Sequence, residues 1–227
     1  TIHSFPTRRS SDLERIVEHG DATPGELALT EINTGLLALP AGVLARHVRA
    51  LDADNAQGEY YLTDVVGCIR AEGDRVAAVQ PEYDWEVQGV NSPQQLATLE
   101  RAWQCHLADR LMTAGVCLRD PERIDIRGTL TAGADVMIDA GCVFGGHVEL
   151  GAGVRVGANC VLCDCHIGAG TVIEPLCHLQ GVVTESDCRI GPFARLRPGT
   201  FMAYRARVGN FVEAKNSQIG AGSKINH

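Results

Sequence analysis

Several features that would assign a location or a partner are missing from this 227-residue sequence. No apolar run approaches the ~20 residues of a membrane-spanning helix, and the first residues lack the charged, apolar and small-residue regions of a signal peptide. No excess of positive charge is present either, because the net charge is −8, which disfavours nucleic acid as a partner. We therefore expect a cytoplasmic protein that binds neither membranes nor nucleic acid.

A six-residue phrase repeats from about Ile138 to the last residue. Each phrase has an aliphatic residue, often followed by glycine, and a compact residue four positions after the aliphatic one. The aliphatic positions are Ile138, Phe144, Leu150, Val156, Leu162, Ile167, Ile173, Leu179, Ile190, Leu196, Met202, Val208, Ile219 and Ile225. A hexapeptide period is typical of a parallel β-helix.

The geometry of such a coil explains the spacing. Three phrases close one coil, so residues about eighteen apart stack at roughly 4.8 Å, the spacing between neighbouring strands. We expect the aliphatic side chains to fill the interior and the compact ones to lie near the corners. Shorter spacings, such as the five residues from Leu162 to Ile167, are expected to be absorbed at corners.

Nine cysteines leave a metal site as an alternative interpretation. The segment CVLCDCH at 160–166 superficially resembles a metal-binding sequence. The repeat gives a different account, because Cys142, Cys160 and Cys177 take the same compact position in successive coils, where a free cysteine packs as a small hydrophobe. We favour packing, and reduced thiols agree with a cytoplasmic protein.

A helix is predicted directly before the repeat. Ser92, Pro93 and Gln95 form an N-cap, a first-turn proline and a capping-box partner, and Gly115 is a C-cap. Apolar residues recur between them at spacings of three and four: Leu96, Leu99, Trp103, Leu107 and Leu111. This pattern predicts a linker helix over 92–115 whose apolar stripe is a packing surface.

The sequence before this helix is of the α/β type. Strand-like runs cover 31–39 and 75–80, and a helix is predicted over 63–72. No glycine-rich phosphate loop with a basic residue occurs in it. Residues 1–13, TIHSFPTRRSSDL, have neither strand nor helix periodicity and resemble translated sequencing-adapter sequence, so we expect a non-native or disordered leader there.

Motifs throughout the remaining sequence resemble one family. They are RIVEH (15–19), EINTG (31–35), NAQGEYYLTD (55–64), EVQGVN (86–91), LRDP (118–121), RGTL (127–130), IGPFARLRPG (190–199) and VGNFVEAKNS (208–217). From about Glu14 to His227 the chain resembles the bifunctional N-acetylglucosamine-1-phosphate uridylyltransferase and glucosamine-1-phosphate N-acetyltransferase family.

The resemblance implies a role in UDP-N-acetylglucosamine biosynthesis. It implies that 14–91 is the C-terminal part of a Rossmann-like nucleotidyltransferase domain and that 116–227 is a left-handed parallel β-helix with acetyltransferase activity. It further implies a homotrimer, Mg²⁺ as cofactor, and UTP and acetyl-CoA as co-substrates.

Three site residues of the uridylyltransferase are implied by the family motifs. Glu18 and Asn33 match positions that hold the sugar and ribose of UDP-N-acetylglucosamine, and Asn91 matches a substrate-binding residue that also ligates Mg²⁺. An oxygen ligand suits Mg²⁺. The alternative is that all three are turn residues, since asparagine tolerates turn backbones.

Three more residues are implied for acetyl transfer. Arg197 and Lys215 match positions that contact the sugar phosphate, which suits a bidentate guanidinium and a mobile ammonium. His227 matches the catalytic base, and an imidazole can take a proton from the attacking amine near neutral pH. The alternative is a solvated face, as we expect for Arg155, Arg189 and Arg207.

The chain also departs from the family pattern. The glycine-rich UTP loop and the metal-binding aspartate belong before Glu14, and the acetyl-CoA contacts belong after His227. We therefore expect an internal fragment that carries parts of two active sites and is inactive in both reactions.

Other functions stay open at this point. The nearest is a single-activity sugar-1-phosphate nucleotidyltransferase with a structural β-helix. A metal hydratase of the γ-carbonic-anhydrase type would use histidines such as His147, His166 and His178, although their phases in the repeat differ. A non-enzymatic solenoid is the third.

Overall fold

The computed structural model describes residues 4–9 and 12–227. They form two compact units, 1–90 and 91–227. No helix in the described part of the chain is both long and apolar enough to cross a bilayer.

The first unit has a small core between a hairpin and a helix. Its elements are β1 (Ser4–Arg9), β2 (Asp12–Glu18), η1 (His19–Asp21), α1 (Ala41–Val48), α2 (Asp64–Ala71) and η2 (Asp84–Val87). Leu13 and Ile16 of β2 pack against Val66 of α2. The predicted helix over 63–72 is thus confirmed as α2.

Two strand predictions in this unit are wrong. Segments 31–39 and 75–80 form no strand, because in the described residues neither lies beside a backbone that could pair with it along its length. A single bond, from the Leu13 amide to the Val76 carbonyl at 3.3 Å, joins the second segment to β2. The leader, expected to lack regular structure, contains β1 paired antiparallel with β2; its positions 1–3 and 10–11 lie outside the described residues.

A charged turn follows the hairpin. Glu26 accepts hydrogen bonds from the Thr23 amide at 2.9 Å and from Arg15 at 2.7 Å. The bonds from Thr23, and then that from Arg15, lower the pKa of Glu26 to about 2.

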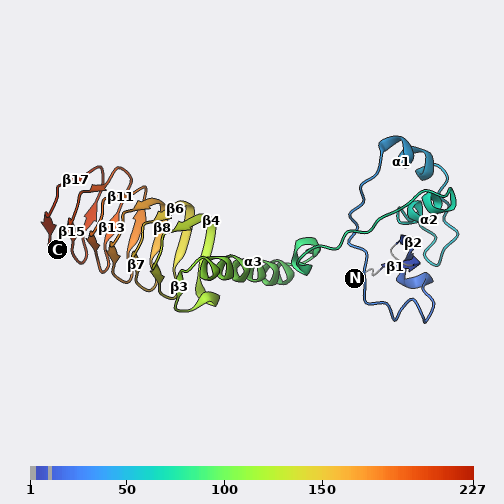
Figure 1. Ribbon diagram of the computed structural model, residues 1–227, viewed down its shortest axis with the longest axis horizontal. Helices are drawn as coiled ribbons and strands as arrows, with labels where there is room; N and C mark the ends of the chain where they lie inside the picture. Colours follow the sequence, from blue (N-terminus) through green and yellow to red (C-terminus); the bar gives the residue numbers. More distant parts are fainter. Residues whose placement is uncertain (1–3, 10–11) are drawn as a thin grey trace. The chain divides into compact units, whose positions relative to one another are not determined.

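The second unit is a solenoid of parallel strands on three faces (Figure 1). Face 1 contains β10 (His178–Gln180), β13 (Arg195–Leu196) and β16 (Glu213–Ala214). Face 2 contains β11 (Val183–Thr184), β14 (Phe201–Met202) and β17 (Gln218–Ile219). Face 3 contains β3 (Cys117–Leu118), β5 (Met137–Ile138), β7 (Arg155–Val156), β9 (Val172–Ile173), β12 (Arg189–Ile190), β15 (Arg207–Val208) and β18 (Lys224–Ile225). Strands β4 (Asp125–Ala132), β6 (Val143–Leu150) and β8 (Val161–Ile167) bend from face 1 into face 2. A short helix, η3 (Pro121–Arg123), lies between β3 and β4.

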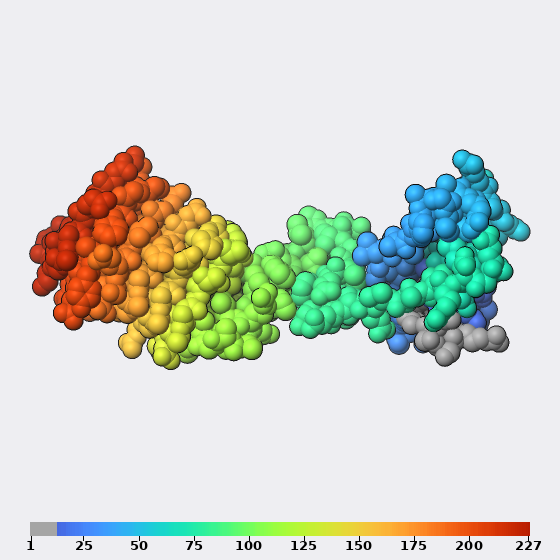
Figure 2. Space-filling view, turned by 45° about the horizontal axis from the view of Figure 1, so that its top comes forward, coloured from blue at the N-terminus to red at the C-terminus, as the bar shows by residue number. Residues whose placement is uncertain are grey.

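The chain passes from one face to the next at three corners, named 1–2, 2–3 and 3–1 after the faces that they join. Successive coils are in register at seventeen or eighteen residues, as Val161↔His178 and Arg195↔Glu213 show. In Figure 2 the colours change in order along the solenoid, from yellow-green to red, as the coils follow one another. The predicted stacking interval is confirmed, and the one-residue differences are absorbed without breaking the strand pairing.

The interior is filled as the repeat predicts. All the predicted aliphatic residues from Ile138 to Ile219 are buried, whereas Ile225 is 37% exposed. Cys142, Cys160 and Cys177 are buried in the compact position, and burial raises the pKa of the Cys142 thiol. Thr184 fills an interior position that the aliphatic pattern missed.

Helix α3 (Pro93–Thr113) closes the first coil of the solenoid (Figure 1). The Ser92 hydroxyl accepts from the Gln95 amide at 3.2 Å, which confirms the predicted N-cap. The apolar stripe is only partly a packing surface, because Leu107 and Leu111 contact the core while Leu96 is 57% exposed.

A glutamine of α3 ends the sheet at its open edge. The Gln104 side chain donates to the Ile126 carbonyl at 3.0 Å and accepts from the Ile126 amide at 2.7 Å. It thereby satisfies the backbone groups that β4 would otherwise leave buried without a partner.

Candidate functional site

Arg197 and Lys215 lie beside each other at corner 1–2. Each directly follows a strand of face 1, and these strands pair with Leu196 opposite Ala214. The Arg197 amide donates to the Ala214 carbonyl at 2.9 Å. The two side chains therefore start one strand spacing apart, roughly 4.8 Å.

The corner is held by the residues after Arg197. The Thr200 hydroxyl donates to the Arg197 carbonyl at 2.7 Å. Gly199 adopts φ +81°, and a side chain there would overlap the Asn216 carboxamide of the next coil. The Arg-Pro-Gly sequence thus makes a tight turn that fixes where the arginine side chain begins.

Positive charge exceeds negative charge at this place. Arg195, Arg197 and Lys215 supply three cations, and Glu213 supplies one carboxylate. Glu213 Oε1 accepts from Arg197 at 3.2 Å and lies 4.0 Å from Arg195 Nε. Because the Arg197 and Glu213 side chains are 40% and 53% exposed, the ion pair between them is worth only ~0–1 kcal/mol and can be exchanged for an anionic ligand.

His227 lies at the opposite edge of face 1. It follows β18 of face 3, whose Lys224 pairs with Arg207, so it lies at the start of corner 3–1. Its side chain is exposed. The structure therefore brings Arg197 and Lys215 together and places His227 across face 1 from them, within the same end of the solenoid.

Glu18 borders a separate acidic cavity in the first unit. Its Oε1 accepts from the Thr63 hydroxyl at 3.1 Å, while its Oε2 is buried without a hydrogen-bond partner. Tyr61 lines the same cavity, of about 280 Å³, and its hydroxyl is buried. Burial, and then the charge of Asp21, raise the pKa of Tyr61.

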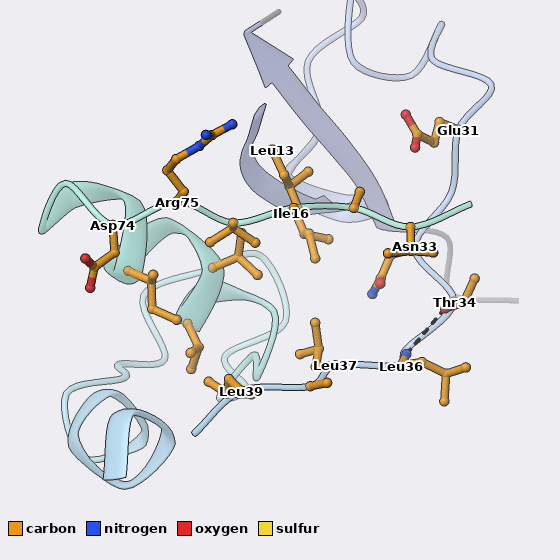
Figure 3. A pocket seen from close by; sticks show the side chains of 18 of the residues that line it. Leu13, Ile16, Glu31, Asn33, Thr34, Leu36, Leu37, Leu39, Asp74 and Arg75 are labelled. Carbon is orange, nitrogen blue, oxygen red and sulfur yellow. Dashed lines mark hydrogen bonds between the residues drawn. The ribbon is translucent and has the colours of Figure 1, made fainter. Parts of the chain in front are cut away.

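Asn33 lines a larger, mostly apolar cavity of about 830 Å³ in the first unit. Figure 3 shows Asn33 and Thr34 at one end of it and Asp74 and Arg75 at the other. The Asn33 Oδ1 atom accepts from the Gly35 amide at 3.3 Å, which is the turn geometry of the alternative interpretation.

Asn91 is the first residue of the second unit and is exposed. Its amide donates to Gln95 Oε1 at 2.7 Å, which ties it to the start of α3. The carboxamide oxygen suits a Mg²⁺ ligand by its chemistry. In the described residues, no three His, Cys, Asp or Glu side chains gather in a way that could hold a metal.

The histidines of the metal-hydratase alternative are divided between faces. Glu149 accepts from His147 Nε2 at 2.8 Å and from His166 Nδ1 at 2.7 Å on face 2. His178 lies on face 1. His178 therefore lies on a different face from His147 and His166, in agreement with their different phases in the repeat.

Four residues that lie near the predicted site residues are not indicated by the motifs: Tyr61, Thr63, Arg195 and Glu213. Arg195 and Glu213 are eighteen residues apart, so the stacking interval already contained the signal for that pair. No comparable sequence signal links Thr63 with Glu18, which are 45 residues apart.

Parallel strands on three faces, with a hexapeptide register, define the class of the second unit as a hexapeptide-repeat solenoid. Residues 133–163 match the family described as "Bacterial transferase hexapeptide (six repeats)".

The chain is related over nearly its whole length to the bifunctional GlmU proteins. It is 52% identical over 220 residues to the bifunctional protein GlmU of Janthinobacterium sp. (strain Marseille), which covers 97% of this chain and 49% of that protein. It is 55% identical over 212 residues to that of Alkalilimnicola ehrlichii, covering 93% of this chain and 46% of that protein. The resemblance that the motifs indicate is confirmed, and the chain spans about half the length of these relatives.

A weaker likeness is to a solved structure of a mutant of AntD, an N-acyltransferase from Bacillus cereus, with dTDP and coenzyme A. The TM-score is 0.42 at 14% identity, and the match covers 49% of this chain and 80% of that one.

Proposed function

We propose that the second unit binds the phosphate of glucosamine 1-phosphate at Arg197 and Lys215, as part of a site for acetyl transfer from acetyl-CoA. The observation that supports it is the stacking of these two residues, in register, where cations outnumber carboxylates. A guanidinium and an ammonium one strand apart match the oxygens of one phosphate group.

His227 then acts on the other end of the substrate. The sugar amine attacks the thioester carbon, a nitrogen–carbon bond forms and the carbon–sulfur bond breaks as coenzyme A leaves. The imidazole accepts the proton that the amine loses. Its place across face 1 from the phosphate-binding pair suits a ligand that carries its phosphate and its amine on different carbons.

The first unit serves uridylyl transfer from UTP to N-acetylglucosamine 1-phosphate in this proposal. The unpartnered Glu18 Oε2 can accept from a sugar hydroxyl or amide, and Asn33 can bind the ribose. Asn91, the first residue of the second unit, matches a family position that would supply one oxygen ligand to Mg²⁺. Residues 14–91 are then the C-terminal part of a Rossmann-like nucleotidyltransferase domain, and the parent enzyme is a cytoplasmic homotrimer with a left-handed β-helix.

Calorimetric titration of the 227-residue chain with glucosamine 1-phosphate tests the proposal. Replacing Arg197 by Ala removes a charge-assisted hydrogen bond of about 1.5–3 kcal/mol, so the dissociation constant should rise by a factor of about 10 to 150. Arg155→Ala, at an exposed arginine on face 3, is the matched control and should leave the constant unchanged.

The same titration distinguishes this proposal from the alternative of a single-activity nucleotidyltransferase. A nucleotidyltransferase with a purely structural solenoid predicts that Arg197→Ala and Arg155→Ala bind the sugar phosphate equally well. Equal constants for the two variants would therefore reject acetyl transfer at this corner.

A further inference from the structure

A chain of hydrogen bonds crosses three successive strands at the bend between face 1 and face 2. The strands are β4, β6 and β8, which lie side by side (Figure 1). The Thr129 hydroxyl lies 2.7 Å from His147 Nδ1, and His147 Nε2 lies 2.8 Å from Glu149 Oε1. His166 Nδ1 lies 2.7 Å from the second oxygen of Glu149. The four side chains are on the outer surface of the solenoid, where solvent reaches them.

The carboxylate determines where each proton lies. The hydrogen bond from His147, and then that from His166, lower the pKa of Glu149, so this group is ionised near neutral pH and its oxygens can only accept. Each imidazole nitrogen that bonds Glu149 therefore carries a hydrogen. In a neutral ring the other nitrogen of His147, Nδ1, has none, so it accepts from the Thr129 hydroxyl. The order of hydroxyl, imidazole and carboxylate is that of a nucleophile, its general base and the group that orients the base.

The backbone around His147 is held by the neighbouring coil. The His147 amide donates to Asp164 Oδ1 at 3.0 Å, and this bond is the main cause of the lowered pKa of Asp164. Gly146 has φ +61°, and a side chain there would overlap the Asp164 carboxylate. Thr129 lies in register with His147 on the paired strand. Strand pairing thus places the hydroxyl beside the base.

A backbone donor lies next to the hydroxyl. In the described residues β4 pairs with β6 on one side, and Gln104 takes the Ile126 amide on the other side. Because alternate residues of a strand direct their amides to the same side, the Leu130 amide points to the same edge as that of Ile126. Leu130 directly follows Thr129, and the amide after a nucleophile is a common donor to the oxyanion that forms in acyl transfer.

We propose that Thr129 and His147, with Glu149 as a positioning residue, hydrolyse short-chain acyl esters at this bend. The Thr129 oxygen attacks the ester carbonyl carbon, and its proton passes to His147 Nδ1 as the new carbon–oxygen bond forms. The bond to the alcohol then breaks, and the alcohol leaves with that proton. Water attacks the acyl-threonine in the same way, which releases the carboxylic acid and restores the hydroxyl.

This site is separate from the one of the proposed function. Gly145, Cys163, Gln180 and Arg197 stack in successive coils, so three coils, roughly 14 Å, separate the coil of His147 from that of Arg197. The outcome at one site is therefore independent of the outcome at the other. An exposed nucleophile favours small, reactive esters over substrates that depend on a binding pocket.

Hydrolysis of p-nitrophenyl acetate by the 227-residue chain tests the proposal. Thr129→Val keeps the shape of the side chain and removes the hydroxyl, whereas His147→Gln removes the base. A general base contributes about 10²–10⁴-fold, so at this exposed site we expect each variant to lower kcat/KM about 100-fold. Thr129→Ser restores a hydroxyl and should recover most of the activity. His178→Gln, at an exposed histidine of face 1, is the matched control and should keep the wild-type rate.

Glu149→Gln tests the positioning role. The glutamine can accept one hydrogen bond but lacks the charge that stabilises a protonated imidazole, so kcat should fall about tenfold while KM is unchanged. The acid limb of the pH profile of kcat/KM should also move to lower pH, because a nearby carboxylate no longer favours the protonated base. A merely structural role of Glu149 predicts a lower melting temperature and an unmoved pH profile.

Peptide mapping after acid quenching identifies the acylated residue. We expect an acetyl group on Thr129 in the wild type and none at this position in Thr129→Val, which should melt at the wild-type temperature because the side chain is exposed. The proposal is overturned if Thr129→Val hydrolyses the ester at the wild-type rate, if the acetyl group is found elsewhere than on Thr129, or if His178→Gln loses as much activity as His147→Gln.

Discussion

Replacing Gln104 by leucine should destabilise the solenoid by opening its first coil. The Gln104 carboxamide makes two hydrogen bonds with the backbone of Ile126, and the side chain is 2% exposed. Leucine has a similar volume and keeps the packing, but it can neither donate nor accept. The change thus isolates the polar contribution of one side chain.

The magnitude follows from the two backbone groups that lose their partner. Each buried amide or carbonyl without a hydrogen bond costs about 1–3 kcal/mol, so the loss of both partners should cost about 2–6 kcal/mol. This is a large part of the ~5–15 kcal/mol by which a domain is usually stable. Urea unfolding followed by far-ultraviolet circular dichroism measures it as a lower midpoint with an unchanged slope.

Two controls make the result specific. Gln94→Leu changes an exposed glutamine of the same helix and should lie within about 0.5 kcal/mol of the wild type. Gln104→Glu can restore both bonds only when its carboxyl is protonated, so its stability relative to the wild type should improve as the pH falls. Equal midpoints for Gln104→Leu and the wild type would refute the role of Gln104 as the end of the sheet.

Three further predictions concern charge and backbone. Glu213→Gln frees Arg197 from its exposed ion pair, which is worth up to about 1 kcal/mol. Calorimetry should therefore show up to about fivefold tighter binding of glucosamine 1-phosphate. Weaker binding by Glu213→Gln would contradict this prediction. The pKa of Glu26 is lowered from 4.5 to about 2, so its carboxylate stabilises the first unit above pH 4.5, and this contribution should be lost as the pH falls from 4.5 through about 2. Acid titration of Glu26→Gln beside the wild type should show a stability difference that closes as the pH falls through this range. Gly128 has φ +155°, and a Cβ atom added there would overlap the Gly146 carbonyl. Gly128→Ala should therefore lower the free energy of unfolding, measured with urea, by about 3 kcal/mol. An unchanged free energy of unfolding would reject this close approach.

The solenoid could be predicted from the sequence because its period is local and redundant. Every coil repeats the same burial requirement, so Leu162 and Leu179 identify the same interior position independently. The aliphatic pattern did not predict the interior position of Thr184, because a polar residue gives no hydrophobic signal in the sequence. Thr184 is nevertheless buried, and its hydroxyl accepts a hydrogen bond from the Gly168 amide at 2.9 Å.

The first unit was less predictable because strands depend on partners. Segments 31–39 and 75–80 have strand composition, but composition does not supply a neighbouring backbone. Helix α2 was predictable because its hydrogen bonds are internal to 64–71.

The candidate site shows the same division. The stacking interval predicts that Arg195 and Glu213 are neighbours, and it follows that Arg197 and Lys215 are too. The position of His227 across face 1 from Arg197 and Lys215 could not be predicted in this way. It depends on the number of residues at each corner, and the sequence pattern alone does not fix that number.

The most direct test of the central claim is the binding of glucosamine 1-phosphate compared with glucosamine, measured by the chemical shifts of the Arg197 side chain in the 227-residue chain. If Arg197 and Lys215 hold the phosphate, the sugar phosphate shifts the Arg197 guanidinium resonance at concentrations where glucosamine does not, and Lys215→Ala weakens that response. Equal responses to the two ligands, or a response that Lys215→Ala leaves unchanged, would contradict the account.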